Sequence, residues 1–225
     1  MTRPPARARA AAGVPALAWT LVAAGGGCGH GSPGSGQPAP RGTVRLPPSY
    51  QPRSIGRGPA FRPPPLGAAA RAGRPIRALG GADLRCGPLS RTRFAAHVEL
   101  FAHGRVVAIP AGIGVAPPLR RDGARVLGGR CSYPLRSSEP TGVIEVSGGG
   151  GRPVLGDLFA VWGQPLSLAR LAGFAAGPGG VRAYVDGHRH AGDPRRVALS
   201  PHAQIVLEVG GFVPPHPVYR FPPGR

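Results

Sequence analysis

The chain contains no lysine among its 225 residues, and acidic residues are scarce. The missing lysine excludes sites that depend on a lysine amine, such as the phosphate-binding lysine of a P-loop or the Schiff base of a pyridoxal enzyme. Only nine acidic residues stand against 28 arginines, and none of the nine lies in the first 80 residues. Arginine therefore sets the formal net charge, which is +19.

A charge this positive is often a sign of a nucleic-acid partner, because arginine side chains neutralise phosphates. The composition argues against that interpretation. Alanine, glycine, proline and arginine dominate, which is typical of a GC-rich genome whatever the function of the protein. An exported protein would also meet anionic lipids and wall polymers before any nucleic acid. We therefore expect a cell-envelope polymer, a lipid surface or a protein as the partner, and no nucleic acid.

The first 28 residues follow the order of a secretory signal. Three arginines come first, an apolar run follows from about residue 10 to residue 24, and small residues precede Cys28. The apolar run is shorter than the roughly 20 residues that a membrane-spanning helix needs. We therefore expect export, to an extracellular or membrane-attached location. Cys28 is a candidate lipidation site, and ordinary cleavage nearby is the alternative, because Gly25 stands where lipoprotein signals usually have a larger aliphatic residue.

Composition separates two further regions. Residues 29–80 are rich in glycine, proline, serine and arginine and lack apolar periodicity. Such a segment cannot bury enough surface to offset its chain entropy, so we expect a disordered spacer. Residues 81–225 contain all nine acidic residues together with 17 arginines. Their length suits one globular domain.

Short strands and tight turns dominate the predicted globular region. Strands are expected at residues 97–101, 106–109, 143–146, 181–185, from 188 onward, and at 203–209. His103 with Gly104, and Asp186 with Gly187, offer the turns of two hairpins. This order of elements predicts a small, mostly antiparallel α+β domain.

One short helix is expected within this region, at residues 155–162. Its apolar residues fall at positions i, i+3, i+4 and i+7: Leu155, Leu158, Phe159 and Trp162. Gly163 supplies a stop signal. We expect the apolar face of this helix to pack on the sheet.

Cys86 and Cys131 are the two cysteines that remain beside Cys28. In an oxidising compartment their pairing is the default expectation, and the chain has no C-x-x-C pattern for zinc or redox chemistry. The disulfide would close a loop of about 45 residues and stabilise the domain by about 4 kcal/mol in the chain-entropy model.

Five blocks of sequence lie in a specific order along the domain. They are HVELFAHG at 97–104, VAIPAGIGV at 107–115, CSYPLRSSEPTGVIEV at 131–146, LGDLFAVWGQPLS at 155–167 and PHAQIVLEVG at 201–210. In these blocks, over roughly residues 84–225, the chain resembles a family of exported prokaryotic proteins of unassigned function. Typical members carry H-x-H-x-H in the first strand and C-x-Y-x-L-H-T-H-D, followed by G-V-I-H, before the helix. The resemblance implies a site rich in histidine, which would suit a transition metal such as copper or zinc.

Most of those histidine places hold other residues in this chain. In the first element, Arg93 and Ala95 occupy the first two histidine places. In the second element, Arg136 and Ser138 occupy the two histidine places, and Glu139 occupies the aspartate place. Glu145 occupies the later histidine place. His97, Glu139 and Glu145 remain as candidate metal ligands. The alternative is that His97 lies with Glu99 on a polar face of the strand.

Two more candidate ligands, His188 and His190, alternate along one predicted strand, and an exposed hairpin with incidental histidines is the alternative. Glu139 and Glu145 could act as an acid/base pair, or could simply be solvated. No serine lies in a G-x-S-x-G element. The chain therefore offers no defined catalytic residue, and we expect no cofactor.

These observations favour an exported, non-catalytic binding or interaction domain of the cell envelope, which acylation of Cys28 would attach to a membrane. A copper- or zinc-binding envelope protein is the alternative. An envelope hydrolase is a second alternative, and it would need a serine, a histidine and a carboxylate to converge.

Overall fold

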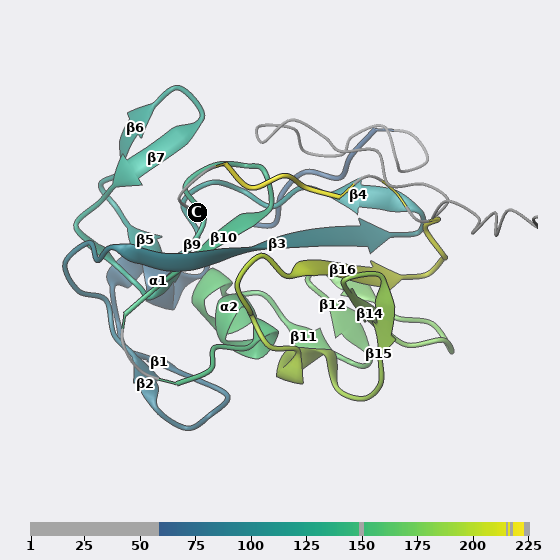
Figure 1. Ribbon diagram of the computed structural model, residues 1–225. Helices are drawn as coiled ribbons and strands as arrows, with labels where there is room; N and C mark the ends of the chain where they lie inside the picture. Colours follow the sequence, from purple (N-terminus) through teal and green to yellow (C-terminus); the bar gives the residue numbers. More distant parts are fainter. Residues whose placement is uncertain (1–58, 149–150, 215, 217, 223–225) are drawn as a thin grey trace, which may run out of the picture. The chain divides into compact units, whose positions relative to one another are not determined.

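The computed structural model describes residues 59–148, 151–214, 216 and 218–222 (Figure 1). The chain divides into two units, Met1–Pro38 and Ala39–Arg225. All described residues belong to the second unit, so the predicted signal, Cys28 and residues 29–58 of the predicted spacer lie outside the described part. Within that part, no helix has the length and apolar character needed to cross a membrane.

A seven-stranded sheet forms the centre of the second unit. Its strands are β3 (Thr92–Ala102), β4 (Arg105–Val107), β9 (Leu135–Arg136), β10 (Val143–Ser147), β14 (Arg182–Val185), β15 (His188–His190) and β16 (Gln204–Val209). The order is β15-β14-β16-β3-β10-β9, and β4 pairs with β3. The fold is thus mostly β-sheet with mostly antiparallel pairs, which confirms that much of the prediction.

Strand β3 lies at the middle of this sheet and is buried along most of its length. It pairs antiparallel with β10 on one side and parallel with β16 on the other. The parallel pairing joins segments about 100 residues apart in the chain, with Gln204 opposite His97. Two parallel strands cannot be joined by a tight turn, so no hairpin pattern in the sequence predicted that β16 pairs with β3.

Both predicted hairpins are confirmed. The turn between β3 and β4 consists of His103 and Gly104, with φ angles of 51° and 73°. The turn between β14 and β15 consists of Asp186 and Gly187, with φ angles of 50° and 81°. Two consecutive residues with positive φ match a turn that follows the twist of antiparallel strands.

The predicted helix is also confirmed, as α2 (Leu155–Trp162), and Gly163 ends it in the left-handed conformation. Its four periodic apolar residues are at most 1% exposed. They share one hydrophobic cluster with the inward side chains of β3 and β16, so the helix covers one face of the sheet. At its start, Asp157 accepts hydrogen bonds from the backbone N–H groups of Val154 and Leu79.

Several short elements surround this centre. They are α1 (Ala68–Ala72), β1 (Ile76–Arg77), β2 (Asp83–Leu84), β5 (Val115–Ala116), β6 (Arg120–Asp122), β7 (Arg125–Gly128), β8 (Cys131–Ser132), β11 (Leu166–Ser167), β12 (Arg170–Leu171), β13 (Phe174–Ala175) and the 3-10 helix η1 (Pro194–Arg196). The expectation of a single helix therefore missed α1.

The disulfide between Cys86 and Cys131 is present, as the sequence predicted. It joins the segment after β2 to the first residue of β8. The early part of the domain is thereby linked to its middle.

Residues 59–80 belong to the folded unit, which corrects the predicted domain start at residue 81. Phe61 forms a bridge with Val107 of β4. Gly67 donates a backbone hydrogen bond of 2.8 Å to the carbonyl oxygen of Trp162. The segment contributes Ala70 and Ile76 to the hydrophobic core, and Phe61 packs against that core.

The contact between this segment and the end of α2 provides a test. A Cβ atom added at Gly67 would lie 2.7 Å from the Cα atom of Gly163. We expect Gly67→Ala to lower the free energy of unfolding by about 1–3 kcal/mol, as overpacking does. Chemical denaturation of the purified protein would measure this change.

Gly177→Ala is the matched control, because a Cβ atom at Gly177 would meet no atom within 4 Å. We expect this control to leave the stability nearly unchanged or slightly raised. Equal effects of the two substitutions would show that residues 59–67 do not pack on α2.

Candidate functional site

The sheet face opposite α2 carries most of the buried charge of the described residues, and we call it the polar sheet face. Its polar members alternate with core residues along five strands: Arg136, Glu145, His97, Glu99, Gln204, Glu208 and Arg182. The register places Arg136 opposite Glu145, Gln204 opposite His97, and Arg182 opposite Glu208. Strand pairing thus brings charged residues from distant parts of the chain together.

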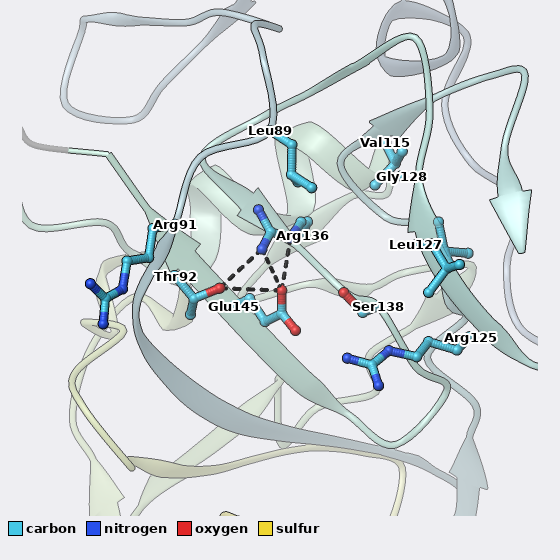
Figure 2. Close-up of a pocket in the computed structure, with 11 residues that line it drawn as sticks. Leu89, Arg91, Thr92, Val115, Arg125, Leu127, Gly128, Arg136, Ser138 and Glu145 are labelled. Atoms are coloured by element: carbon cyan, nitrogen blue, oxygen red, sulfur yellow. Dashed lines mark hydrogen bonds and ion pairs between the residues drawn. The ribbon is translucent and has the colours of Figure 1, made fainter. Parts of the chain in front are cut away.

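Arg136 and Glu145 form a buried ion pair at one end of this face (Figure 2). The carboxylate oxygen Oε2 accepts hydrogen bonds from Arg136 Nε at 2.8 Å and from the Thr92 hydroxyl at 3.4 Å. Arg136 Nη1 donates to the Ser90 carbonyl at 3.2 Å, and Nη2 donates to Thr92 at 3.0 Å. The guanidinium group is therefore satisfied inside the protein.

A cavity of about 350 Å³ opens beside this ion pair. We call it the arginine cavity, because Arg91, Arg125 and Arg136 line it together with Leu89 and Leu127. In Figure 2, Arg91 and Arg125 lie on opposite sides of the central ion pair. The cavity thus combines positive charge with apolar side chains at its margin.

The residues at the histidine places of the resembling family do not all meet at this site. Glu145 pairs in register with Ala95, and Arg136 contacts Glu145. A register shift between Val146 and Ser147 turns Arg93 away, where it donates to the carbonyl of Gly148 at 3.0 Å. Thr92 takes its place beside Glu145. Arg93 therefore does not add its charge beside Glu145.

The candidate metal ligands have separate partners. Glu139 pairs with Arg125 at 3.6 Å, Glu145 pairs with Arg136 at 2.7 Å, and His97 Nε2 lies 2.9 Å from the Thr141 carbonyl. His188 and His190 lie on the edge strand β15. Among the residues that the structure describes, no group of three histidine, cysteine or acidic side chains has the geometry to hold a metal ion.

The C-terminal segment, residues 212–214, 216 and 218–222, covers the other end of the polar sheet face. Tyr219 stacks on His97 with ring centroids 4.4 Å apart. His216 Nε2 contacts a carboxylate oxygen of Glu99, and its ring packs against Phe101. His97 and Glu99 do lie on one polar strand face, but the segment leaves them only 2% and 7% exposed.

Burial and charge shift the two histidines in opposite directions. Desolvation lowers the pKa of His97, and the nearby negative charge of Glu99 only partly opposes it. Desolvation also acts to lower the pKa of His216, but its hydrogen bond and ion pair with Glu99 outweigh that effect and raise the pKa above its ordinary value. Glu99 thus favours the protonated form of His216, whereas burial favours the neutral form of His97.

Glu208 is the second buried carboxylate at this end, with 2% exposure. Its Oε1 accepts a hydrogen bond from the Val213 backbone N–H at 3.1 Å, and its Oε2 lies 3.2 Å from Arg182 Nη2. Oε2 has no hydrogen bond of good geometry. Desolvation raises the pKa of Glu208, although Val213 and Arg182 oppose the shift.

A second cavity, of about 420 Å³, lies between this end of the polar sheet face and the C-terminal segment. We call it the acidic cavity. Glu99 and Glu208 line it together with Tyr184, Val206 and Phe212. Its walls are mainly apolar. Glu99 and Glu208 reach it from the sheet, Asp186 from the turn between β14 and β15, and His216 from the C-terminal segment.

Sequence reasoning missed the burial of Glu99 and Glu208, and it missed His216 altogether. Alternation placed Glu99 on a polar strand face, but it could not show that a later segment covers that face. His216 lies among prolines, without strand or helix periodicity. Its contact with Glu99 depends on the path of the C-terminal segment, which returns to β3.

Comparison of the chain with protein family models, with curated proteins and with solved structures finds no match to any of them.

Removing one partner of the buried ion pair should destabilise the fold strongly. We expect Arg136→Ala to lower the free energy of unfolding by about 3–5 kcal/mol, because Glu145 would keep a buried charge without its partner. The matched control is Arg125→Ala, whose partner Glu139 is 28% exposed, so a loss of only about 0–1 kcal/mol is expected. Urea denaturation would measure both, and similar losses would contradict the assignment of a buried pair.

His216 should make stability depend on pH. Because its pKa is raised in the folded state, its contribution is complete below the ordinary histidine pKa of about 6.5 and is lost as the pH rises through the raised value. We therefore expect the stability difference between the wild type and His216→Gln to be largest in acid and to shrink towards alkaline pH. His97 has the opposite dependence but is present in both proteins. Denaturation at several pH values would test this, and a constant difference would contradict it.

Proposed function

We propose that this chain is an exported, non-catalytic binding domain of the cell envelope, of α+β type, and that the acidic cavity is its ligand site. The observation that carries the proposal is the pair of buried carboxylates, Glu99 and Glu208, in an apolar-walled cavity of a strongly basic protein. Such a cavity, with few polar groups among apolar walls, is typical of a ligand site.

The lining indicates the chemistry of the ligand. Tyr184, Val206 and Phe212 offer apolar contact, and Phe212 is 60% exposed and accessible from outside. Glu208 is a buried acid whose pKa is raised, because Val213 and Arg182 only partly offset the cost of burying its negative charge. A positively charged group near it would lower that electrostatic cost. The ligand we propose therefore has an apolar body and an amine.

A binding role fits this arrangement better than hydrolysis. His97 and Glu99 line the acidic cavity, but its described lining contains no serine or cysteine that could act as a nucleophile. His97 also directs Nε2 to the Thr141 carbonyl, and its ring is covered by Tyr219. These contacts hold the imidazole in place as part of the wall.

Export is supported by the leader sequence and by the disulfide. The Cys86 to Cys131 bond suits an oxidising compartment. We propose that the domain functions outside the cytoplasm, attached to a membrane if Cys28 is acylated, and released if the leader is cleaved nearby. Its partner there is a component of the envelope that carries an amine.

Titration with two small probes tests the ligand site. We expect n-hexylamine to bind saturably and about tenfold more tightly than 1-hexanol, because only the ammonium group can form an ion pair with Glu208. NMR shifts of the purified protein would report both affinities. The Glu208→Gln variant should lose most of this preference for the amine.

The control is Glu139→Gln, which removes a glutamate outside the acidic cavity. It should retain the preference. Thermal unfolding of each variant would verify that it is folded. Equal binding of the two probes, or no saturable binding of either, would rule out an amine site in the acidic cavity.

A further inference from the structure

The hairpin formed by β6 and β7 is a separate two-stranded sheet that extends away from the central sheet (Figure 1). Three of its residues are exposed arginines, Arg120, Arg121 and Arg125, and Asp122 is its single acid. The hairpin therefore concentrates positive charge at a protruding part of the domain.

Strand β7 alternates between buried and exposed residues. Val126 faces inward, where its N–H donates to the Ser138 carbonyl at 2.8 Å, so the hairpin is held to the domain. Arg125 and Leu127 consequently face outward on the same side of the strand. Leu127 is 46% exposed.

The segment before β3 adds the same two kinds of side chain. Leu89 is 54% exposed, Arg91 is exposed, and both line the arginine cavity together with Arg125 and Leu127 (Figure 2). Exposed leucines and arginines from two segments thus meet at one place. We call this patch, Leu89, Arg91, Arg120, Arg125 and Leu127, the hairpin surface. Arg121 lies opposite Val126 in the strand register, on the other face of the hairpin, and is not part of it.

Exposed arginines beside exposed leucines favour one class of anionic partner over the others. A dissolved polyanion requires only positive charge, and exposed leucines would add nothing to its binding. At a bilayer interface, arginines reach the lipid phosphates while leucines enter the boundary with the acyl chains. A second copy of this chain would present the same positive surface and be repelled.

We propose that the hairpin surface docks the domain on a bilayer that contains anionic phospholipids. Arg91, Arg120 and Arg125 contact the headgroups, and Leu89 and Leu127 lie at the interface. This inference rests on the proposed export to the envelope, but not on the acidic cavity or its ligand.

Vesicle binding by the full-length protein tests the proposal. The probes are vesicles of phosphatidylglycerol and phosphatidylcholine at 30:70, and vesicles of phosphatidylcholine alone. We expect the triple variant R91Q/R120Q/R125Q to lose more than about tenfold in affinity for the anionic vesicles, since each arginine near such a surface contributes about fivefold. Co-sedimentation over a series of lipid concentrations would measure this loss.

The matched control is R77Q/R170Q/R189Q, which removes the same charge from exposed arginines on β1, β12 and β15. Its affinity should fall much less. Equal losses for the two triple variants would overturn the proposal, because binding would then depend on net charge alone.

The leucines distinguish a bilayer from a soluble polyanion. We expect L89Q/L127Q to weaken vesicle binding while leaving binding to inorganic polyphosphate unchanged. If vesicle binding were also unchanged, the hairpin surface would be a site for an anionic polymer and not for a bilayer. Because no amine probe is involved, neither outcome depends on the acidic cavity.

Discussion

Strand β3 is buried on both of its faces, and most other features follow from this constraint. Its inner face packs with α2, and its outer face lies beneath the C-terminal segment. Polar side chains on that outer face cannot be hydrated by bulk water, so each needs a partner within the protein. Glu99 has His216, His97 has the Thr141 carbonyl, and on adjacent strands Glu145 has Arg136 and Glu208 has Arg182.

This internal pairing determines how charge is distributed. The chain has few acidic residues, and several of them are used in buried pairs or helix and turn contacts, such as those of Asp157 and Asp186. Exposed arginines are then left in excess, most clearly on the β6 and β7 hairpin. The domain therefore offers two different kinds of surface. One is the hairpin surface, which is basic and partly apolar. The other is the acidic cavity beneath the C-terminal segment. Each is the basis of one proposal.

The ion pair of Arg136 and Glu145 also bears on the candidate metal site. Glu145 was a candidate ligand, but Arg136 neutralises its charge at a distance of 2.7 Å. The register shift in β10 strengthens this arrangement, because it brings Thr92 to the pair and removes Arg93. A sequence comparison that assumes strict alternation along β3 would place Arg93 there instead.

The sequence by itself determined the local features of this protein. Turn residues that accept positive φ predicted both hairpins, and four apolar residues at helical spacing predicted α2. These patterns report torsion angles and the faces of elements, which are properties of nearby residues. The disulfide joins residues 45 apart, and it was predicted because only two cysteines remain beside Cys28. Only the tertiary structure decided that β16 lies parallel to β3, that residues 59–80 complete the core, and that His216 reaches Glu99. These contacts join residues far apart in the chain, and they depend on which surfaces remain open after the local elements have packed.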